Sequence, residues 1–339
     1  MNALKRLIWS QIPLFLLCGL AVADEGLFGS HEVIDVELRG PLRAVVRDDR
    51  KRRERPFTIR VGGERPVPVD IRVRGKSRVR ECRFPPLRLD FAPEDAAGSV
   101  FEGLDKVKLV THCRDREHYE RNVLDEYAAY RILNLLTERS HRVRLLRVSY
   151  IDTERPDAPP LVRLSFVLEP VEQVAARLGA DIAETEYVVK SRLEPRQTAL
   201  VSAFHYLIGN VDWSLVAAED EELCCHNGSL LLIDGEYVLL PYDFDLSGLV
   251  DAKYAKPHPS VPIRSVTDRL YRGYCMEGLP LDDALATIIS RRQDILDLVR
   301  ALPGADPDGT ANRIAFLEDF FAEAAGGKLV EKWVDGCIG

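Results

Sequence analysis

Oxygen-bearing side chains near the middle of the chain have the types and spacing that phosphate chemistry requires. Asp212 follows a helical pattern that ends at Gly209, and a strand–turn–strand pattern then lies between Asn227 and Asp243. Amide and carboxylate oxygens are ligands that Mg²⁺ takes in proteins, usually together with phosphate oxygens. A further acid can orient or deprotonate an attacking hydroxyl group. These residues predict a magnesium-dependent phosphate site if the fold brings them together.

The strand–turn–strand pattern predicts a hairpin with a defined register. Apolar runs flank Asp234-Gly235, a strong signal for a two-residue β-turn. A turn there puts Asn227 opposite Tyr242, one residue before Asp243. Directly opposed residues lie about 5 Å apart, so Asn227 and Asp243 can share a cation. Asp245 adds a second carboxylate on the same side if the strand continues. The alternative is that these acids are solvated loop residues.

A second charged set lies earlier in the chain. Glu126 falls on the apolar stripe of a helix predicted to begin near Arg121. Burying a carboxylate is costly unless a cation meets it. Lys108, on the preceding predicted strand, is the candidate partner. Lys106 faces the same side of that strand, so the choice between the two lysines stays open, as does an exposed Glu126 without a partner.

These residues are the groups that a phosphoryl-transfer site uses. The chain resembles the CotH family of secreted atypical kinases and, more distantly, the HipA-type kinases. The resemblance extends over about residues 72–248. It is carried by the segments LIGNVDWS, CHNGSLLL and LLPYDFDLSG, preceded by IRVRGKSRVRECRFPPLRLDF, KVKLVTH and EYAAYRIL.

The resemblance implies ATP and Mg²⁺ (or Mn²⁺) as cofactors. Asp212 matches the catalytic aspartate of the family, and Asn227 and Asp243 match its metal-binding pair. Asp245 stands at a position that can be Asn in the family and is a possible additional metal ligand.

The resemblance also implies nucleotide contacts in the first half of the chain. Lys108 would pair with Glu126 and contact phosphate, and the backbone near Leu168 and Glu169 would form the adenine-binding hinge. The loop over the phosphates would contain Gly75, Lys76, Ser77 and Arg78.

The expected fold is α+β and bilobal, like that of protein kinases. Alternating apolar patterns predict an antiparallel sheet and one main helix in residues 24–170, the N-lobe. Helical patterns dominate residues 171–339, the C-lobe. The change from strand to helix at Pro170 marks the predicted boundary.

The composition and the N-terminal segment limit the class of protein to which this chain can belong. The chain has 339 residues, a net charge of -8 and 46% apolar residues, too apolar for a disordered chain. A basic pair, Lys5-Arg6, an apolar run over 12–20 and Ala21-Val22-Ala23 predict a signal peptide, residues 1–23, cleaved before Asp24. A periplasmic or secreted protein is therefore expected. Later apolar stretches are too short to predict a membrane span.

Positive charge is concentrated between Arg39 and Arg88, where 17 Lys and Arg stand against 6 Asp and Glu. This bias favours contact with anionic groups. The alternative is that the arginines line the solvated face of a sheet. Too few aromatic residues are interleaved for a nucleic-acid platform, so nucleic acid is not an expected partner.

Six cysteines follow the predicted signal peptide, so disulfides in an exported chain and buried free thiols are both open. Cys224-Cys225-His226 is not expected to bind zinc, because adjacent cysteines seldom ligate one ion together and no C-x-x-C partner is present.

The predicted function is phosphorylation of a protein, whose identity the sequence does not reveal. Transfer of AMP or glutamate by a kinase-like fold is an alternative. A metal-dependent phosphohydrolase is another; it would use Asp212, Asp243 and Asp245 with His205 or His226. A third is an inactive binding protein of the cell envelope.

Overall fold

The computed structural model of the chain describes residues 26–48, 51–217 and 223–339, and the predicted signal peptide lies outside these ranges. The strands, in chain order, are β1 (Ile34–Gly40), β2 (Arg55–Val61), β3 (Val67–Val73), β4 (Leu87–Asp90), β5 (Lys106–Val110), β6 (Val143–Asp152), β7 (Leu161–Leu168), β8 (Asp181–Ile182), β9 (Gly228–Ile233) and β10 (Glu236–Pro241). The α-helices are α1 (Leu42–Arg47), α2 (Ser77–Glu81), α3 (Pro93–Ala96), α4 (Glu117–Leu136), α5 (Val171–Leu178), α6 (Pro195–Ile208), α7 (Leu281–Ser290), α8 (Arg292–Arg300), α9 (Pro307–Ala325) and α10 (Leu329–Asp335), with 3₁₀ turns at Gly26–Phe28 and Lys190–Arg192.

The first seven strands close into a barrel in the order β1-β2-β3-β4-β5-β7-β6. Neighbouring strands are antiparallel except for β1 and β6, whose parallel pairing closes the barrel. Burial alternates along β3 as the apolar pattern predicts, with Val69, Ile71 and Val73 inside. The predicted antiparallel sheet is confirmed in most of its pairings, but its closure was not predicted.

The basic stretch contributes mainly to the solvated face of this barrel. Arg60 on β2 donates to Glu37 on β1 at 2.7 Å. Arg88 on β4 donates to Asp90 at 3.0 Å and to Glu54. Cross-strand pairs of opposite charge stabilise a sheet modestly, so much of the local charge excess is a structural feature of the barrel.

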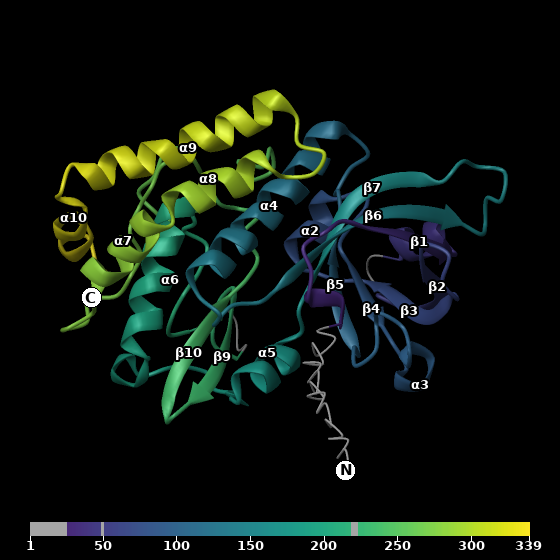
Figure 1. Ribbon diagram of the computed structural model, residues 1–339, viewed down its shortest axis with the longest axis horizontal. Helices are drawn as coiled ribbons and strands as arrows, with labels where there is room; N and C mark the ends of the chain where they lie inside the picture. Colours follow the sequence, from purple (N-terminus) through teal and green to yellow (C-terminus); the bar gives the residue numbers. More distant parts are fainter. Residues whose placement is uncertain (1–25, 49–50, 218–222) are drawn as a thin grey trace, which may run out of the picture.

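The helix α4 connects the barrel with the helical part of the chain (Figure 1). The predicted stripe of Val123, Tyr127, Tyr130 and Leu133 is buried, and the helix starts at Glu117, earlier than predicted. Acidic residues in its first turn favour this start because they oppose the positive end of the helix dipole.

The predicted division into two lobes is wrong in one respect. The strand-to-helix change at Pro170 is confirmed, since β7 ends at Leu168 and α5 begins at Val171. One apolar cluster, however, extends across this point. It contains Leu133 of α4 and Phe166 of β7 together with Leu317 and Trp333 of the C-terminal helices. The barrel interior forms a second cluster, and a smaller one beside the hairpin contains Trp213, Leu230 and Leu239.

The six cysteines of the described chain form three disulfides: Cys82–Cys113, Cys224–Cys225 and Cys275–Cys337. The first joins α2 to the segment after β5. The third ties the segment before α7 to the chain terminus. None of the helices within residues 26–48, 51–217 and 223–339 combines the length and apolar character needed to cross a bilayer.

Trp333 is the largest fully buried side chain of the shared core. Its ring stacks on that of Tyr271 and packs edge-on with that of Tyr206, and each pair of ring centroids is 5.4 Å apart. Trp333→Ala should lower the free energy of unfolding by about 3–5 kcal/mol because a cavity replaces the indole. Urea denaturation measures this loss. Val334→Ala, at an adjacent side chain that is 55% exposed, is the matched control and should change stability by less than about 0.5 kcal/mol.

Candidate functional site

Asp212 is placed by the end of α6. Gly209 ends this helix with a φ of +64°, and the amide of Asn210 donates to the carbonyl of His205 at 2.8 Å. This is the glycine C-cap predicted from the sequence. The side chain of Asn210, and not that of Asp212, forms the turn by accepting from the amide of Asp212 at 3.0 Å. The carboxylate of Asp212 is therefore left for other partners.

Both carboxylate oxygens of Asp212 contact residues of the β9 end. Oδ1 lies 2.9 Å from Nε2 of His226, and Oδ2 accepts from the amide nitrogen of Asn227 at 2.9 Å. Asn227 Nδ2 also donates to the backbone carbonyl of Asp212 at 2.7 Å. The predicted convergence of Asp212 and Asn227 is thus confirmed. The sequence suggests His226 only as a metal ligand, and nothing in its spacing indicates this contact with Asp212.

The hairpin has the predicted register. β9 and β10 pair Gly228 with Pro241, and the amide of Tyr242 donates to the carbonyl of Asn227 at 2.9 Å. Asp243 follows at once, and its amide donates to the hydroxyl of Tyr130 on α4 at 2.8 Å. Asn227 and Asp243 therefore lie at the same end of the hairpin.

Asn227 and Asp243 also share an unusual backbone conformation. Their φ values are +53° and +63°, in the left-handed region that asparagine and aspartate adopt more readily than other side chains with a Cβ atom. Neither residue lies in the hairpin turn, where such a conformation is common. Both residues therefore leave the hairpin strands with the same backbone conformation.

Arg78 on α2 joins the hairpin end to α4. This side chain is buried, and its guanidinium donates to Glu126 at 2.7 Å and to Asp245 at 2.8 Å. It also lies 3.6 Å from the carboxylate of Asp243. We refer to Arg78, Glu126, Asp243 and Asp245 as the Arg78 cluster.

The Arg78 cluster holds three carboxyl groups around one cation. Burial raises the pKa of Glu126 to about 8 and that of Asp245 to about 6, although Arg78 opposes both shifts. Burial also acts on Asp243, but Arg78 and Arg74 outweigh it and hold the pKa of Asp243 below its ordinary value. At neutral pH Asp243 and Asp245 are therefore charged, whereas Glu126 mostly holds a proton, and Asp243 is the most exposed of the three.

The predicted pairing of Lys108 with Glu126 is wrong, because Arg78 occupies the position beside Glu126. The Nζ atom of Lys108 lies instead 4.1 Å from the centre of the Tyr242 ring. Burial lowers the pKa of Lys108 to about 8. Lys106 is exposed and donates to Asp105 at 3.0 Å, so Lys108 is the lysine that faces the hairpin end.

The loop predicted over the phosphates is only partly as expected. Gly75 has a φ of +96°, and its carbonyl accepts from Arg52 at 2.6 Å. Lys76 is exposed at the start of α2, and Ser77 is the first residue of that helix. Arg78 points away from such a loop and into the cluster with Glu126. Its role cannot be told from sequence, because nothing distinguishes it from the other arginines of the basic stretch.

The predicted adenine hinge at Glu169 is contradicted. The amide of Glu169 donates to the carbonyl of Arg142 at 2.9 Å, and its own carbonyl lies 2.8 Å from Nδ1 of His141. Its carboxylate binds Arg177 at 2.9 Å. The backbone of Glu169 is therefore already used to hold β6 and β7 together and offers no free groups to a nucleotide base.

The residues at the hairpin end fit a magnesium ion that also binds phosphate. Asn227 uses its amide nitrogen for Asp212, which leaves the amide oxygen for a ligand, and Asp243 supplies a charged, half-exposed carboxylate. Asp245 does not fit, since Arg78 holds it in a buried position. Across the described ranges, no three His, Cys, Asp or Glu side chains gather in a way that would hold a metal ion. A two-ligand site of this kind needs phosphate and water oxygens to complete the shell of Mg²⁺.

Comparisons with known proteins leave the family open. No protein-family model matches the chain, and no curated protein is similar to it in sequence. Among solved structures, the proinflammatory kinase CtkA of Helicobacter pylori aligns with 74% of this chain and 91% of its own length, at 11% identity and a TM-score of 0.38. This similarity is too weak to assign a fold family, so the resemblance to CotH kinases stays a prediction.

Glu126→Gln tests the charge balance of the Arg78 cluster. The pKa of Glu126 is higher in the folded protein than its ordinary value of 4.5, so the wild type loses stability as the pH rises from about 4.5 to about 8. The glutamine variant lacks this loss. We therefore expect the free energy of unfolding of Glu126→Gln, taken relative to that of the wild type, to increase from pH 5 to pH 8.

Chemical denaturation at several pH values measures this trend. Glu117→Gln, at an exposed position of the same helix, is the control and should show a constant difference. A constant difference for Glu126→Gln as well would mean that Glu126 does not take up a proton on folding.

Proposed function

We propose that this chain is an exported phosphotransferase that uses ATP and Mg²⁺ to phosphorylate a protein. The observation that carries the proposal is the juxtaposition at the hairpin end. There His226 and Asn227 hold Asp212 through both carboxylate oxygens, and Asp243 lies at the same end of the hairpin as Asn227. Phosphoryl transfer depends mainly on positioning and on neutralising charge, and this arrangement supports both.

The proposed role of Asp212 is to orient the acceptor hydroxyl group and receive its proton. Its contacts with His226 and Asn227 fix the direction of the carboxylate, which is needed for a group that must meet a hydroxyl in line with the phosphate. His226 acts through Asp212 in this proposal and is a positioning residue.

Asn227 and Asp243 are the residues proposed to hold magnesium. A bound Mg²⁺ would neutralise phosphate charge at this position. Lys108 and Arg78 bring further positive charge toward Asp243, so the site suits an anionic ligand. Because Glu169 is not free to bind adenine, base recognition in this proposal relies on groups other than that backbone.

Substitutions of the two aspartates separate chemistry from binding. Asp212→Asn should reduce phosphate transfer at least about 100-fold while leaving ATP-dependent thermal stabilisation in place. Asp243→Asn should abolish both. Intact-mass spectrometry of the acceptor, or of the chain itself, identifies the transferred group as phosphate, AMP or glutamate.

The matched control is Asp234→Asn, the same change in the turn at the far end of the hairpin. Asparagine tolerates the backbone conformation of Asp234, whose φ is +50°, so activity should be unchanged. The proposal is overturned if the wild type shows neither nucleotide-dependent stabilisation with Mg²⁺ nor any added mass.

The pH dependence of ATP binding tests Lys108. Since its pKa lies at about 8, Lys108 loses its positive charge between pH 7 and pH 9. ATP is an anion, so the Kd of the wild type should rise about tenfold over this range. Lys108→Gln should bind weakly at both pH values with little further change. Calorimetric titration measures the Kd, and Lys106→Gln, on the same strand but exposed, should follow the wild type.

A further inference from the structure

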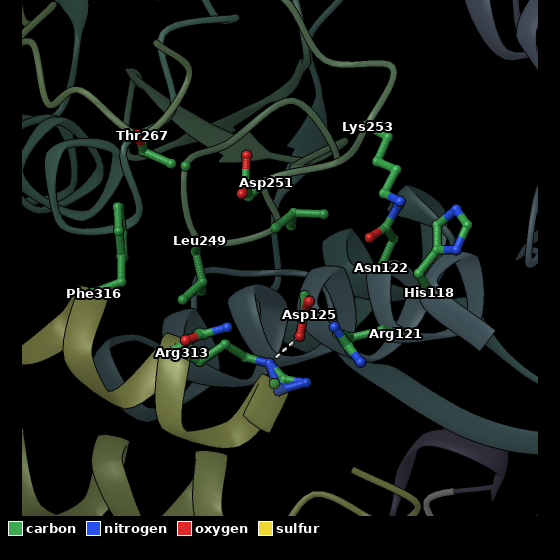
Figure 2. Close-up of a pocket in the computed structure, with 14 residues that line it drawn as sticks. His118, Arg121, Asn122, Asp125, Leu249, Asp251, Lys253, Thr267, Arg313 and Phe316 are labelled. Atoms are coloured by element: carbon green, nitrogen blue, oxygen red, sulfur yellow. Dashed lines mark hydrogen bonds and ion pairs between the residues drawn. The ribbon is translucent and has the colours of Figure 1, made fainter. Parts of the chain in front are cut away.

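A second cavity lies apart from the hairpin end, between α4, the segment 248–253 and α9. Its volume is about 410 Å³, and it is lined by residues of these three elements and by Thr267. Asp212, Asn227 and Asp243 are not among its lining residues. Figure 2 shows polar side chains of α4 and α9 projecting toward one another across it. We call it the α4–α9 cavity.

Unpaired hydrogen-bond donors line the α4–α9 cavity. Arg313 of α9 is 3% exposed and donates through Nε to Asp125 of α4, but neither Nη1 nor Nη2 has a partner among the described residues. The amide nitrogen of Asn122 is likewise buried without an acceptor in the described chain. Buried donors without partners are destabilising. The unsatisfied buried atoms found on this lining are all nitrogens that donate, so the cavity suits a ligand rich in acceptor oxygens.

Further cations stand around the α4–α9 cavity. Arg121 donates to Asp306 at 2.7 Å, and Lys253 is exposed on the segment opposite α4. The pKa of His118, another lining residue, is lowered by burial and then by Lys253, Arg121 and two more arginines. The potential at this side of the cavity is therefore positive.

Three carboxyl groups also lie at or near the cavity. Asp125 is bound to Arg313, Asp306 is bound to Arg121, and Asp251 is exposed on the segment 248–253. Burial raises the pKa of Asp125 to about 8, so this group carries little negative charge beside Arg313 at neutral pH. Asp125 also meets only Nε of Arg313, so the two outer nitrogens have no carboxylate partner among the described residues.

We propose that the α4–α9 cavity binds a phosphate-bearing ligand through Arg313 and Lys253. A guanidinium group with both outer nitrogens available matches two oxygens of a phosphate, and Lys253 supplies a second cation from another element. A tetrahedral oxyanion offers more acceptor oxygens than a carboxylate to donors placed on different walls. The volume exceeds that of phosphate alone, so either a free phosphorylated molecule or a phosphorylated side chain can enter.

Titration of the full chain with inorganic phosphate at constant ionic strength tests this site. Calorimetry should show saturable binding to the wild type. Lys253→Gln should raise the Kd about threefold to fivefold. The paired change Arg313→Gln with Asp125→Asn, which removes the guanidinium together with its carboxyl partner, should raise it at least about tenfold. Lys328→Gln, an exposed cation beyond the end of α9, is the control and should bind like the wild type.

The proposal is overturned if the wild type shows no saturable binding, or if the Lys253 and paired variants bind as tightly as the wild type. Should the paired variant fail to fold, Lys253→Gln decides. Lys108→Gln distinguishes this cavity from the site of the proposed function. Phosphate binding should persist in Lys108→Gln, and its loss there alone would move the phosphate to the hairpin end, where Lys108 is a cation, and refute the proposal.

Peptides identify the source of the phosphate. A short peptide with one phosphoserine is compared with its unphosphorylated form and with inorganic phosphate. Tighter binding of the phosphopeptide, lost in the paired variant, assigns the cavity to a phosphorylated protein. Tighter binding of free phosphate, lost in the same variant, assigns it to a small molecule, and either result supports the proposal.

Discussion

The guanidinium of Arg78 is the contact on which the arrangement of the site depends. It reaches from the short helix α2 to Glu126 on α4 and to Asp245 beyond β10, so one side chain connects the barrel, the connecting helix and the hairpin end. Both carboxyl partners are buried, and removing a buried cation would leave them unpaired at a cost of about 3–5 kcal/mol. The side chains of this cluster are expected to be rigid, because each of them is oriented by at least one other member.

The same cluster determines which acid is available to a ligand. One guanidinium neutralises one carboxylate, and burial raises the pKa of Glu126 and of Asp245 above their ordinary values. Asp243 is the exception, since it is the most exposed of the three acids and receives added stabilisation from Arg74. The amide of Asp243 is fixed by Tyr130 of α4, which ties this acid to the helix that also carries Glu126. Helix α4 therefore contributes to the position of Asp243 through Tyr130 and to the charge of the Arg78 cluster through Glu126.

Local patterns predicted the parts of the site that neighbouring residues determine. The turn at Asp234-Gly235 sets the pairing of Asn227 with Tyr242, because a two-residue turn admits one register. The glycine at 209 ends α6 and releases Asp212. Both features follow from backbone geometry within a few residues, which is why the sequence was sufficient for them.

The features that the sequence did not predict depend on partners far apart in the chain. Arg78 is 48 residues from Glu126 and 167 residues from Asp245 in the chain, and a basic stretch with many arginines does not show which of them turns inward. The hinge prediction failed for a similar reason: Glu169 is bonded to Arg142 and His141 at the edge of β6, which no local pattern shows. Lys108 and Lys106 were indistinguishable by alternation, and only their burial separates them.

Two consecutive residues of α4 link the hairpin end to the α4–α9 cavity. Asp125 binds Arg313 of α9, and Glu126 binds Arg78 of α2, so adjacent carboxyl groups point to different sides of one helix, each toward an arginine of another element. The segment that follows Asp245 also reaches the cavity. Its Gly248 and Leu249 amides donate to the carbonyls of Gly209 and Ile208 at the end of α6. A shift of α4 would therefore alter both the Arg78 cluster and the cavity at once. The hairpin end and the α4–α9 cavity therefore both depend on the position of α4, and a rearrangement of one would change the packing of the other.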